Sequence, residues 1–399
     1  MRFQRFDPSR CDFPEPRVPV LPAFGWQSFE WGRHELFSPL NLDTEIRWYT
    51  RGRYALRDAY AQAGVGEHSS LLAPAYHCRT MLDPAFRLGA EIGLYSLKSD
   101  LTPNMETLGK SLASCKKPVK ALLATHYFGF PQALEALAVF CAEHGIALIE
   151  DCSHAMFPGP GAIPIGTTGD YGITSPYKFF PCEDGGALWS NNGATLPNFP
   201  QRSRSLIREL KGALHSVQRA QVLSHLLDIK TLDAEVDALK EHHLPTGSDI
   251  RESAPQLSNH YDKTEEPLEN LAWSRWIMRH TKVASLISRR RDNYRKWLET
   301  VASLPNCRAL YTSLSSDWVP YMFPLFLDQP EVHFYALKRL GVPVWRWDDM
   351  AVSECSVASS YRLHLVHLPC HQELTTDQMT WMTSAVSTVM RQLPGGVSL

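Results

Sequence analysis

Short apolar runs alternate with amphipathic segments between residues 71 and 151, and this alternation restricts the possible folds more than any other feature of the chain. Each apolar run is continuous and only a few residues long, which is typical of a strand buried on both faces of a parallel sheet. The intervening segment 131–144 has apolar residues at helical spacing, begins at Pro131 and is followed by Gly145. Strands and helices that alternate through right-handed crossovers build a doubly wound sheet. The sequence therefore predicts an α/β fold around a large, mostly parallel sheet.

One predicted strand, at 146–149, ends in the acidic pair Glu150-Asp151. In open α/β sheets, ligands bind beyond the carboxyl ends of the strands. A carboxylate delivered to that edge can hold a cationic ring nitrogen. We expect Asp151 to face the ligand and Glu150 to point to the other face of the strand end, because successive side chains of a strand alternate.

Lys178 follows 27 residues after Asp151, within the stretch Gly169–Ser190. Its flanking aromatic residues and prolines favour partial desolvation, which disfavours the ammonium form and leaves an amine that can condense with a carbonyl. The double glycine Gly185-Gly186 then lets the backbone pass close to another group. A lysine beside a turn is more often a surface residue, so this interpretation depends on its pairing with Asp151. A lysine that takes up an aldehyde and an aspartate that binds a pyridinium are the minimum that a protein contributes to pyridoxal phosphate chemistry.

An ordered set of motifs resembles the DegT/StrS class of sugar aminotransferases, which are fold-type I pyridoxal-phosphate enzymes. The motifs, in chain order, are Thr125-His126-Tyr127-Phe128-Gly129, Glu150-Asp151-Cys152-Ser153-His154, Ser175-Pro176-Tyr177-Lys178, Gly185-Gly186 and Leu368-Pro369-Cys370-His371. The resemblance covers residues 45–192 closely and residues 275–393 more loosely. It implies a fold-type I transferase with a large doubly wound, mostly parallel sheet domain and a smaller C-terminal α+β domain.

The resemblance also implies pyridoxal 5'-phosphate as the cofactor and no metal. Lys178 and Asp151 take the catalytic roles: the lysine binds the cofactor aldehyde and later moves a proton, and the aspartate keeps the ring nitrogen protonated. His154 is expected at the ring or its phenolic oxygen, and Ser175 at the phosphate. His126 is either a further cofactor contact or part of the hydrogen-bonded framework.

The helix start expected to receive the cofactor phosphate departs from the family pattern. The family has Ser-Gly-Thr where this chain has Gly52-Arg53-Tyr54. Helix N-termini favour anions through their free N–H groups and the helix dipole, so these three residues remain candidates for the phosphate site. The hydroxyl role could pass to Tyr54, and Arg53 is either a phosphate ligand or a solvated basic residue.

Two further segments depart from the family pattern. The aromatic residue that stacks on the cofactor ring in the family aligns with Cys78, and Tyr76 or His77 could stack instead. The family's Gly-x-Asn-x-Arg-Met segment, whose asparagine reaches the cofactor phosphate of the neighbouring subunit, is not found. Its nearest candidates, which match poorly, are Arg251, Asn270 and Arg275.

We expect three parts of the chain: an N-terminal arm at 1–43, a large cofactor-binding domain at 44–268 with a helical insertion at 196–268, and a small C-terminal domain at 269–399. The arm is rich in proline and aromatic residues and is expected to drape over the large domain, either as simple packing or as a contact with a partner subunit. In the small domain we expect one long helix over 271–301, whose Arg289-Arg290-Arg291 run is typical of a solvated or salt-bridged face. A strand at 342–347 should place aromatic residues and a cation near the substrate mouth.

Composition excludes several other classes of protein. The 40 basic and 42 acidic residues nearly balance, so nothing indicates binding to nucleic acid or to an anionic membrane surface. No apolar run approaches the roughly 20 residues that cross a bilayer, and the first residues lack the apolar core of a signal peptide. Nine scattered cysteines without a CxxC pair indicate reduced thiols rather than a disulfide framework or a zinc site. We therefore expect a cytoplasmic protein.

The predicted function is transfer of an amino group from an amino acid, glutamate by the resemblance, to a keto sugar attached to a nucleotide, by a homodimer. One alternative is a different pyridoxal-phosphate reaction on the same fold, such as dehydration or amination of a non-sugar acceptor, which the altered phosphate segment leaves open. A second is a catalytically silent binding or regulatory homologue, against which the joint presence of Lys178 and Asp151 argues.

Overall fold

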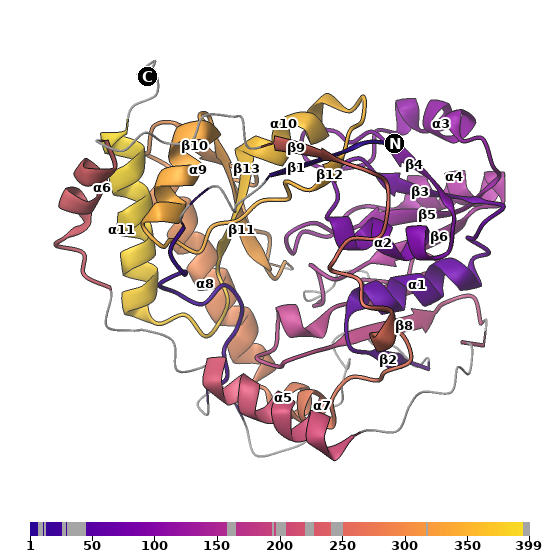
Figure 1. Ribbon diagram of the computed structural model, residues 1–399, viewed down its shortest axis with the longest axis horizontal. Coiled ribbons are helices and arrows are strands. Elements are labelled where there is room, and N and C mark those ends of the chain that lie inside the picture. The colour runs from indigo at the N-terminus through magenta and orange to yellow at the C-terminus, as the bar shows by residue number, and fades with distance from the viewer. Residues whose placement is uncertain are drawn as a thin grey trace.

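The computed structural model describes residues 1–6, 11, 13–25, 29, 45–157, 165–193, 195–196, 205–219, 227–240, 250–316 and 318–393. A large α/β part and a smaller part with its own sheet lie side by side (Figure 1). Within these residues, no helix combines the length and the apolar character needed to cross a membrane. The proposed domain boundaries near residues 43 and 268 remain predictions.

A seven-stranded sheet in the order β2-β8-β7-β6-β5-β3-β4 forms the centre of the large part. β8 runs antiparallel to both of its neighbours, whereas the pairs β3–β4, β3–β5, β5–β6 and β6–β7 are parallel. This arrangement confirms the predicted mostly parallel sheet. The strands are β2 (Arg47–Tyr49), β3 (Ser70–Pro74), β4 (Glu91–Tyr95), β5 (Val119–Thr125), β6 (Ala147–Asp151), β7 (Tyr171–Thr174) and β8 (Gly186–Ser190).

Helices cover both faces of this sheet. α1 (Gly52–Gln62) and α2 (Arg79–Arg87) pack on one face, and α3 (Met105–Ser114) and α4 (Glu135–His144) pack on the other. Neighbouring strand residues divide between the two cores because their side chains alternate: Ile149 belongs to the first and Leu148 to the second. α4 begins four residues later than the helix predicted from Pro131.

The order of the strands creates one point at which the chain reverses its direction of progress across the sheet. β3 lies between β4 and β5, so the connection after β3 runs to one side and the later strands lie on the other. Ligands bind outside the carboxyl ends of the strands at such a switch point. The segments that follow β3, β6 and β7 therefore meet at the edge of the sheet where the predicted site residues lie.

The smaller part is built on the antiparallel sheet β10-β11-β13, and helices pack around it. Its last helix begins with a capping box, in which Thr375 and Gln378 exchange two hydrogen bonds. The elements are β10 (Cys307–Ala309), β11 (Met322–Leu327), β13 (Leu365–Pro369), α8 (Val283–Val301), α9 (Pro330–Arg339), α10 (Ser356–His364) and α11 (Thr376–Gln392).

Two predictions for this part are wrong. The single helix over 271–301 is two helices, α7 (Ala272–His280) and α8, because Thr281 adopts extended backbone and its hydroxyl donates to the carbonyl of Ile277 at 2.8 Å. The segment 342–347 is not a strand. Only Trp345 pairs there, with His367, before the short strand β12 (Met350–Ala351).

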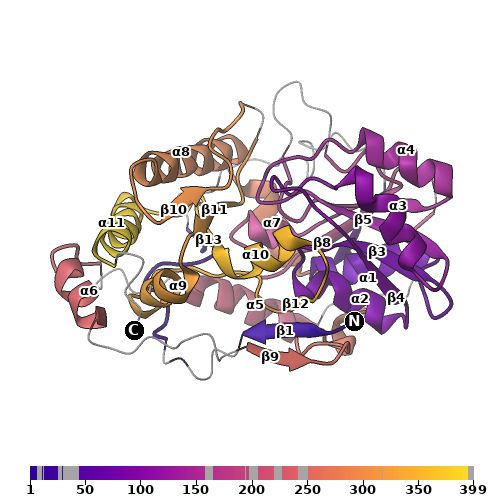
Figure 2. The ribbon, with the colours of Figure 1, turned by 90° about the horizontal axis from the view of Figure 1, so that it is seen from above.

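The described part of the N-terminal arm contacts both the large part and the smaller part, which we call the two lobes. We expected it to drape over the large domain, and it also packs against the smaller one. β1 (Phe3–Phe6) lies between β12 and β9 (Ile250–Ser253) in a third small sheet, and β1 and β9 run side by side in Figure 2. Phe3 packs against Phe86 of α2, whereas Phe6 packs against Phe334 of α9. The arm residues 7–10, 12, 26–28 and 30–44 lie outside the described residues.

The predicted helical insertion contacts both the large part and the smaller part. α5 (Leu206–Arg219) packs against α7, and its Arg208 donates to Asp184 of the large part at 3.1 Å. α6 (Leu232–Lys240) packs against α11 in the smaller part. Residues 197–204, 220–226 and 241–249 of the insertion lie outside the described residues.

Candidate active site

The lysine at the centre of the site stands at the end of a single helical turn. β7 leads through Ser175 into the 3-10 helix η4 (Pro176–Lys178), which begins at a proline. Lys178 is partly buried, and its Nζ lies 5.6 Å from the centre of the Tyr321 ring. The charge of Lys178 also contributes to lowering the pKa of His154 and of His367, after the larger effect of burial. The lysine amine therefore points into a space shared by residues of both lobes.

The two adjacent acids at the end of β6 face opposite sides, as the alternation of strand residues requires. Asp151 is buried, and its Oδ1 accepts a hydrogen bond from the Ser153 N–H at 2.9 Å. Burial and then the charge of Asp151 raise the pKa of Tyr60, so the carboxylate lies on the α1 side of the sheet. Burial raises the pKa of the Cys78 thiol, while the charge of Lys178 lowers it and the charge of Asp151 raises it. The acid and the amine therefore both lie near this thiol.

Glu150 occupies the other face and is fully engaged there. Its two carboxylate oxygens accept from the main-chain N–H groups of Gly166, Thr168 and Gly169 at 3.0, 2.6 and 2.6 Å. Its Oε2 also lies 3.0 Å from Nε2 of His126. This acid ties down the loop that leads into β7, and it does not face the lysine.

His126 is placed in this hydrogen-bonded framework and away from the lysine. Its Nδ1 accepts from the Gln132 N–H at 2.9 Å, so Nε2 carries the proton that is donated to Glu150. Of the two interpretations left open for this histidine, the geometry favours the structural one. The side chains of His126, Glu150 and Cys152 lie close enough to hold a metal ion, but these hydrogen bonds already use both nitrogens of the histidine and both oxygens of the glutamate.

Glycines bring the start of α1 against the segment that carries the lysine. A Cβ at Gly186 would overlap the main chain of Arg51, and a Cβ at Gly52 would overlap Oγ of Ser175. The double glycine thus lets the chain pass close to the backbone at the start of α1. Ser175 Oγ lies 2.9 Å from Oγ of Ser153, so two hydroxyls stand beside the first turn of α1.

The first turn of α1 can receive an anion through its backbone. Arg51, which precedes the helix, makes no side-chain capping bond, so the N–H groups of Gly52 and Arg53 are not capped by that side chain. The Tyr54 hydroxyl instead donates to the Asp262 carbonyl at 2.9 Å, which corrects the idea that it replaces the family's hydroxyl. Burial raises the pKa of Tyr54 to about 12, so the phenol stays neutral.

The three candidates for stacking on a cofactor ring point in different directions. His77 is buried away from the lysine: its Nε2 accepts from the Ala351 N–H at 3.2 Å, and its Nδ1 lies 3.2 Å from the Cys78 carbonyl. Burial lowers the pKa of His77 to about 4, so the ring is neutral. This placement removes His77 from the candidates and leaves Cys78 and Tyr76.

His154 belongs to an aromatic wall around the amine. Its Nδ1 accepts from the Phe128 N–H at 3.5 Å, which leaves the proton on Nε2. Its ring stacks on Tyr321 with centroids 4.4 Å apart, and Trp347 lies at 5.5 Å. Burial and the neighbouring Lys178 hold the pKa of His154 well below its usual range, so this histidine is a neutral hydrogen-bond donor.

Sequence reasoning missed one histidine of this wall and misplaced one cation. His367 on β13 lies 3.1 Å from the Tyr76 hydroxyl and 4.7 Å, centroid to centroid, from Phe128. Its only sequence signal is a polar residue inside an apolar strand. Arg346, predicted near the substrate mouth, instead packs over Phe334 at 4.0 Å.

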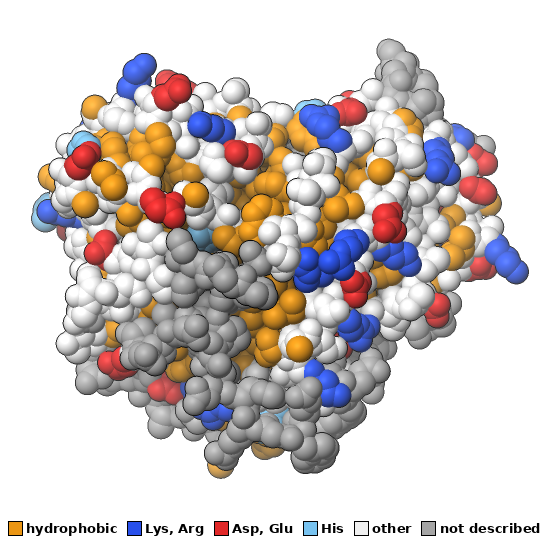
Figure 3. All heavy atoms as spheres, turned by 180° about the vertical axis from the view of Figure 1, so that it is seen from behind, with side chains coloured by type: hydrophobic (Ala, Val, Ile, Leu, Met, Phe, Trp, Pro, Cys, Tyr) orange, Lys and Arg blue, Asp and Glu red, His pale blue; other side chains and the backbone are white. Residues whose placement is uncertain are grey.

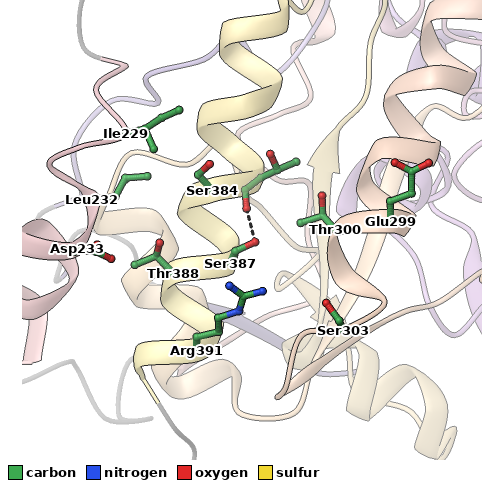
Figure 4. Close-up of a pocket in the computed structure, with 11 residues that line it drawn as sticks. Ile229, Leu232, Asp233, Glu299, Thr300, Ser303, Ser384, Ser387, Thr388 and Arg391 are labelled. Atoms are coloured by element: carbon green, nitrogen blue, oxygen red, sulfur yellow. Dashed lines mark hydrogen bonds between the residues drawn. The ribbon is translucent and has the colours of Figure 1, made fainter.

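The candidates for the missing family segment are used within the chain. The Asn270 side chain accepts from the Arg275 guanidinium at 2.7 Å, and Arg251 lies in β9 beside β1. A separate open pocket of about 540 Å³ lies between α6, α8 and α11 (Figure 4). Hydroxyls along its α11 wall bond back to helix carbonyls, as Ser387 does to Thr383, so we assign this pocket no part in the chemistry.

Comparison with known proteins bears on these assignments. Residues 49–200 match the model of the DegT/DnrJ/EryC1/StrS aminotransferase family. This match covers less than half of the chain and shows a similarity to the family. GDP-perosamine synthase from Vibrio cholerae is 25% identical over 146 residues, which are 36% of this chain and 39% of that protein. The match thus spans well under half of that relative.

Solved structures match over a much larger share of the chain. The aminotransferase TlmJ from Streptoalloteichus hindustanus has a TM-score of 0.62 at 16% identity, covering 90% of this chain and 89% of its own. The putative sugar aminotransferase Spr1654 from Streptococcus pneumoniae in its PLP form has a TM-score of 0.60 at 12% identity, covering 98% and 99%. These likenesses confirm the fold-type I aminotransferase fold.

The similar structure of Spr1654 is a PLP form, and the residues present in this chain fit pyridoxal phosphate. Lys178 offers an amine, Asp151 a buried carboxylate on the same side, and Ser153 and Ser175 offer hydroxyls beside an uncapped helix start. The absence of a side chain at Gly52 lets the helix start approach these hydroxyls, since a Cβ there would overlap Oγ of Ser175.

We predict that Gly52→Ala weakens pyridoxal phosphate binding. The added methyl would displace Ser175 Oγ, and overpacking of this kind costs about 1–3 kcal/mol, or about five- to 150-fold in Kd. Absorbance titration of the cofactor-free protein measures the Kd. Gly109→Ala is the matched control, because no atom lies within 4 Å of a Cβ there. Equal Kd values for the two variants would contradict the assignment of the phosphate site.

Proposed function

We propose that this chain is a pyridoxal-phosphate-dependent aminotransferase of the DegT family that moves an amino group from an amino acid to a keto sugar. The observation that carries the proposal is the meeting of Lys178 and Asp151 on one side of the sheet, beside the helix start at Gly52. Three separate segments supply these groups: the end of β6, the turn after β7 and the beginning of α1. The geometry therefore supports the ordered set of motifs in the sequence.

Each residue has a task that its surroundings suit. When bound, the cofactor supplies a conjugated ring that accepts the electron pair left when a proton leaves the donor's Cα. Lys178 binds the cofactor aldehyde and then serves as the base that moves this proton. Asp151 holds a proton on the ring nitrogen, because a carboxylate in a buried site stabilises the cation strongly. Ser175 and the first turn of α1 bind the phosphate.

His154 and the aromatic wall orient the cofactor and exclude water. The proton on Nε2 of the neutral His154 is available to the phenolic oxygen of the cofactor. Tyr321 and Trp347 close the side of the smaller part around the lysine.

The identity of the acceptor rests on relatives. GDP-perosamine synthase and the putative sugar aminotransferase Spr1654 carry sugars in their names. We propose a nucleotide-linked keto sugar as the acceptor and glutamate as the donor. Incubation with glutamate and a panel of such sugars, with non-sugar ketones in parallel, tests both: 2-oxoglutarate should accumulate only with an accepted sugar. Release of 2-oxoglutarate with a non-sugar ketone alone would instead support the alternative acceptor.

We predict that Asp151→Asn retains the cofactor but lowers the rate of amine transfer by about 10²–10⁴, the range for loss of one catalytic proton-transfer group. The substitution keeps the shape of the side chain and removes the charge that protonates the ring nitrogen. Single-turnover absorbance with glutamate measures the rate, and the absorbance before mixing measures the bound cofactor.

Glu150→Gln is the matched control, since the residue is adjacent and equally buried but faces His126. We expect it to lower the melting temperature, because it weakens hydrogen bonds to three main-chain N–H groups, while the rate per bound cofactor changes far less. If the two variants lose the same rate, or if Glu150→Gln loses more, Asp151 is not the partner of the ring.

We also propose that the chain works as a homodimer. Isologous dimers are the commonest oligomers, and α5 presents an apolar stripe that such a contact would bury. Its residues follow helical spacing and are largely exposed: Leu206 by 81%, Ile207 by 66%, Leu210 by 72% and Leu214 by 59%. Hydrophobic side chains also gather down the middle of the face shown in Figure 3.

Leu210→Glu should therefore convert the dimer into a monomer at micromolar concentration, because it places a charge in the middle of the apolar stripe. Light scattering measures the mass of each species. Lys211→Glu is the control, since Lys211 is an exposed neighbour on the same helix. A wild-type chain that scatters as a monomer and has full activity would refute the dimer.

A further inference from the structure

Arg290 on α8 is the most unexpected charge in the structure. The sequence predicted that the run Arg289-Arg290-Arg291 forms a solvated or salt-bridged face. Arg290 is instead fully buried, with 0% of its surface exposed. Burial lowers the pKa of Arg290 to about 10, so the guanidinium keeps its charge at neutral pH. A buried charge is costly unless hydrogen bonds compensate for its lost hydration.

All the acceptors around this guanidinium are carbonyl oxygens. Nη2 donates to the carbonyls of Lys178 and Phe179 at 3.0 and 3.3 Å. Nη1 donates to the carbonyls of Pro320 and Tyr321 at 3.1 and 3.2 Å. A further bond runs from Nε to the amide oxygen of Gln372 at 2.8 Å. These five bonds match the five N–H groups of an arginine, and no carboxylate is among the acceptors.

The bonds join segments that belong to different lobes. Lys178 and Phe179 lie at the end of η4, where the helical turn no longer supplies N–H partners for its carbonyls. Tyr321 precedes β11 of the smaller part, and its ring lies 5.6 Å from the lysine amine and 4.4 Å from the ring of His154. One guanidinium thus holds the main chain of the reacting lysine and the main chain of Tyr321, whose ring lies beside the lysine amine.

Gln372 reinforces this junction. Its Nε2 donates to the Phe179 carbonyl at 2.8 Å while its Oε1 accepts from Arg290. The guanidinium also lies 4.7 Å over the ring of Phe179. The planar fork of an arginine is needed for this geometry, since an ammonium is a single point from which bonds cannot reach two separated pairs of carbonyls.

We propose that Arg290 is a positioning residue for Lys178. Its guanidinium fixes the main chain of the lysine relative to Tyr321, and so sets where the amine stands in the aromatic wall. Gln372 holds the guanidinium in that orientation. The inference rests on the proposed function, in which Lys178 is the reacting amine. Displacement of a reacting group by about 1 Å can lower a rate by about 10².

The experiment compares Arg290→Lys with wild-type enzyme in amine transfer from glutamate. The lysine variant keeps the charge and loses the fork. We expect kcat per bound cofactor to fall by about 10–10², with the KM for glutamate and the cofactor content near the wild-type values. A purely structural role would lower the melting temperature and the cofactor content, and would leave kcat per bound cofactor unchanged.

Arg289→Met is the matched control. Arg289 also donates to a main-chain carbonyl, that of Leu374 at 2.9 Å, but it does not contact the lysine segment. We expect its kcat per bound cofactor to equal that of the wild type. Gln372→Leu is the milder test of the same junction and should lower kcat per bound cofactor several-fold, in the same direction as Arg290→Lys.

The outcomes distinguish a failure of the Arg290 inference from a failure of the proposed function. An Arg290→Lys enzyme with wild-type kcat per bound cofactor overturns the inference, and so does an equal loss in Arg289→Met. If Arg290→Lys does not fold, Gln372→Leu takes its place. Its kcat per bound cofactor is then compared with that of Arg289→Met, and equal values overturn the inference. A wild-type protein that neither absorbs as a cofactor complex nor transfers an amine refutes the proposed function, and the inference with it.

Discussion

The alternation of side chains along a strand decides which of two neighbouring acids can act in this protein. Glu150 and Asp151 are adjacent and both buried, yet one binds the loop before β7 while the other shares a space with the lysine. A shift of β6 by one residue would exchange them. The pairing of β6 with β5 and β7 fixes this register, so the chemistry depends on the order of the parallel sheet.

Close backbone packing then completes the site. Gly186 and Gly52 allow the strand β8, the start of α1 and the serine after β7 to approach one another more closely than any side chain would permit. The uncapped helix start is thereby directed at two hydroxyls. Asp184, one residue before the double glycine, accepts from the Ser274 hydroxyl at 2.6 Å and ties this loop to α7. The anion site is therefore built from main chain and small residues, in which a change of one methyl group matters.

Much of the fold and part of the site could be predicted because they follow from local rules. Continuous apolar runs identify buried strands, and the acid at the end of such a run marks the ligand edge of the sheet. His77 shows the limit: three adjacent residues were candidates, and only the packing of β12 reveals that His77 accepts from the Ala351 N–H on the far side. Tyr54 was misassigned for a similar reason, since its hydroxyl partner is distant in the sequence.

The errors in the smaller part have one physical cause. Nothing in the sequence of α8 distinguishes Arg290 from Arg289 or Arg291, and its burial depends on carbonyls that three remote segments bring together. The break between α7 and α8 depends in the same way on Thr281 and on its bridge to Phe29 of the arm. Residues that join lobes are found by structure, because their partners are not neighbours in the chain.

The most direct test of the account is to identify the lysine that holds the cofactor. The chain loaded with pyridoxal phosphate would be reduced with borohydride, digested and analysed by mass spectrometry. The account predicts a pyridoxyl group on the peptide that contains Lys178, and its absence from Lys178→Ala treated in the same way. A modified lysine elsewhere in the wild type, or an equally modified Lys178→Ala, would contradict the central claim.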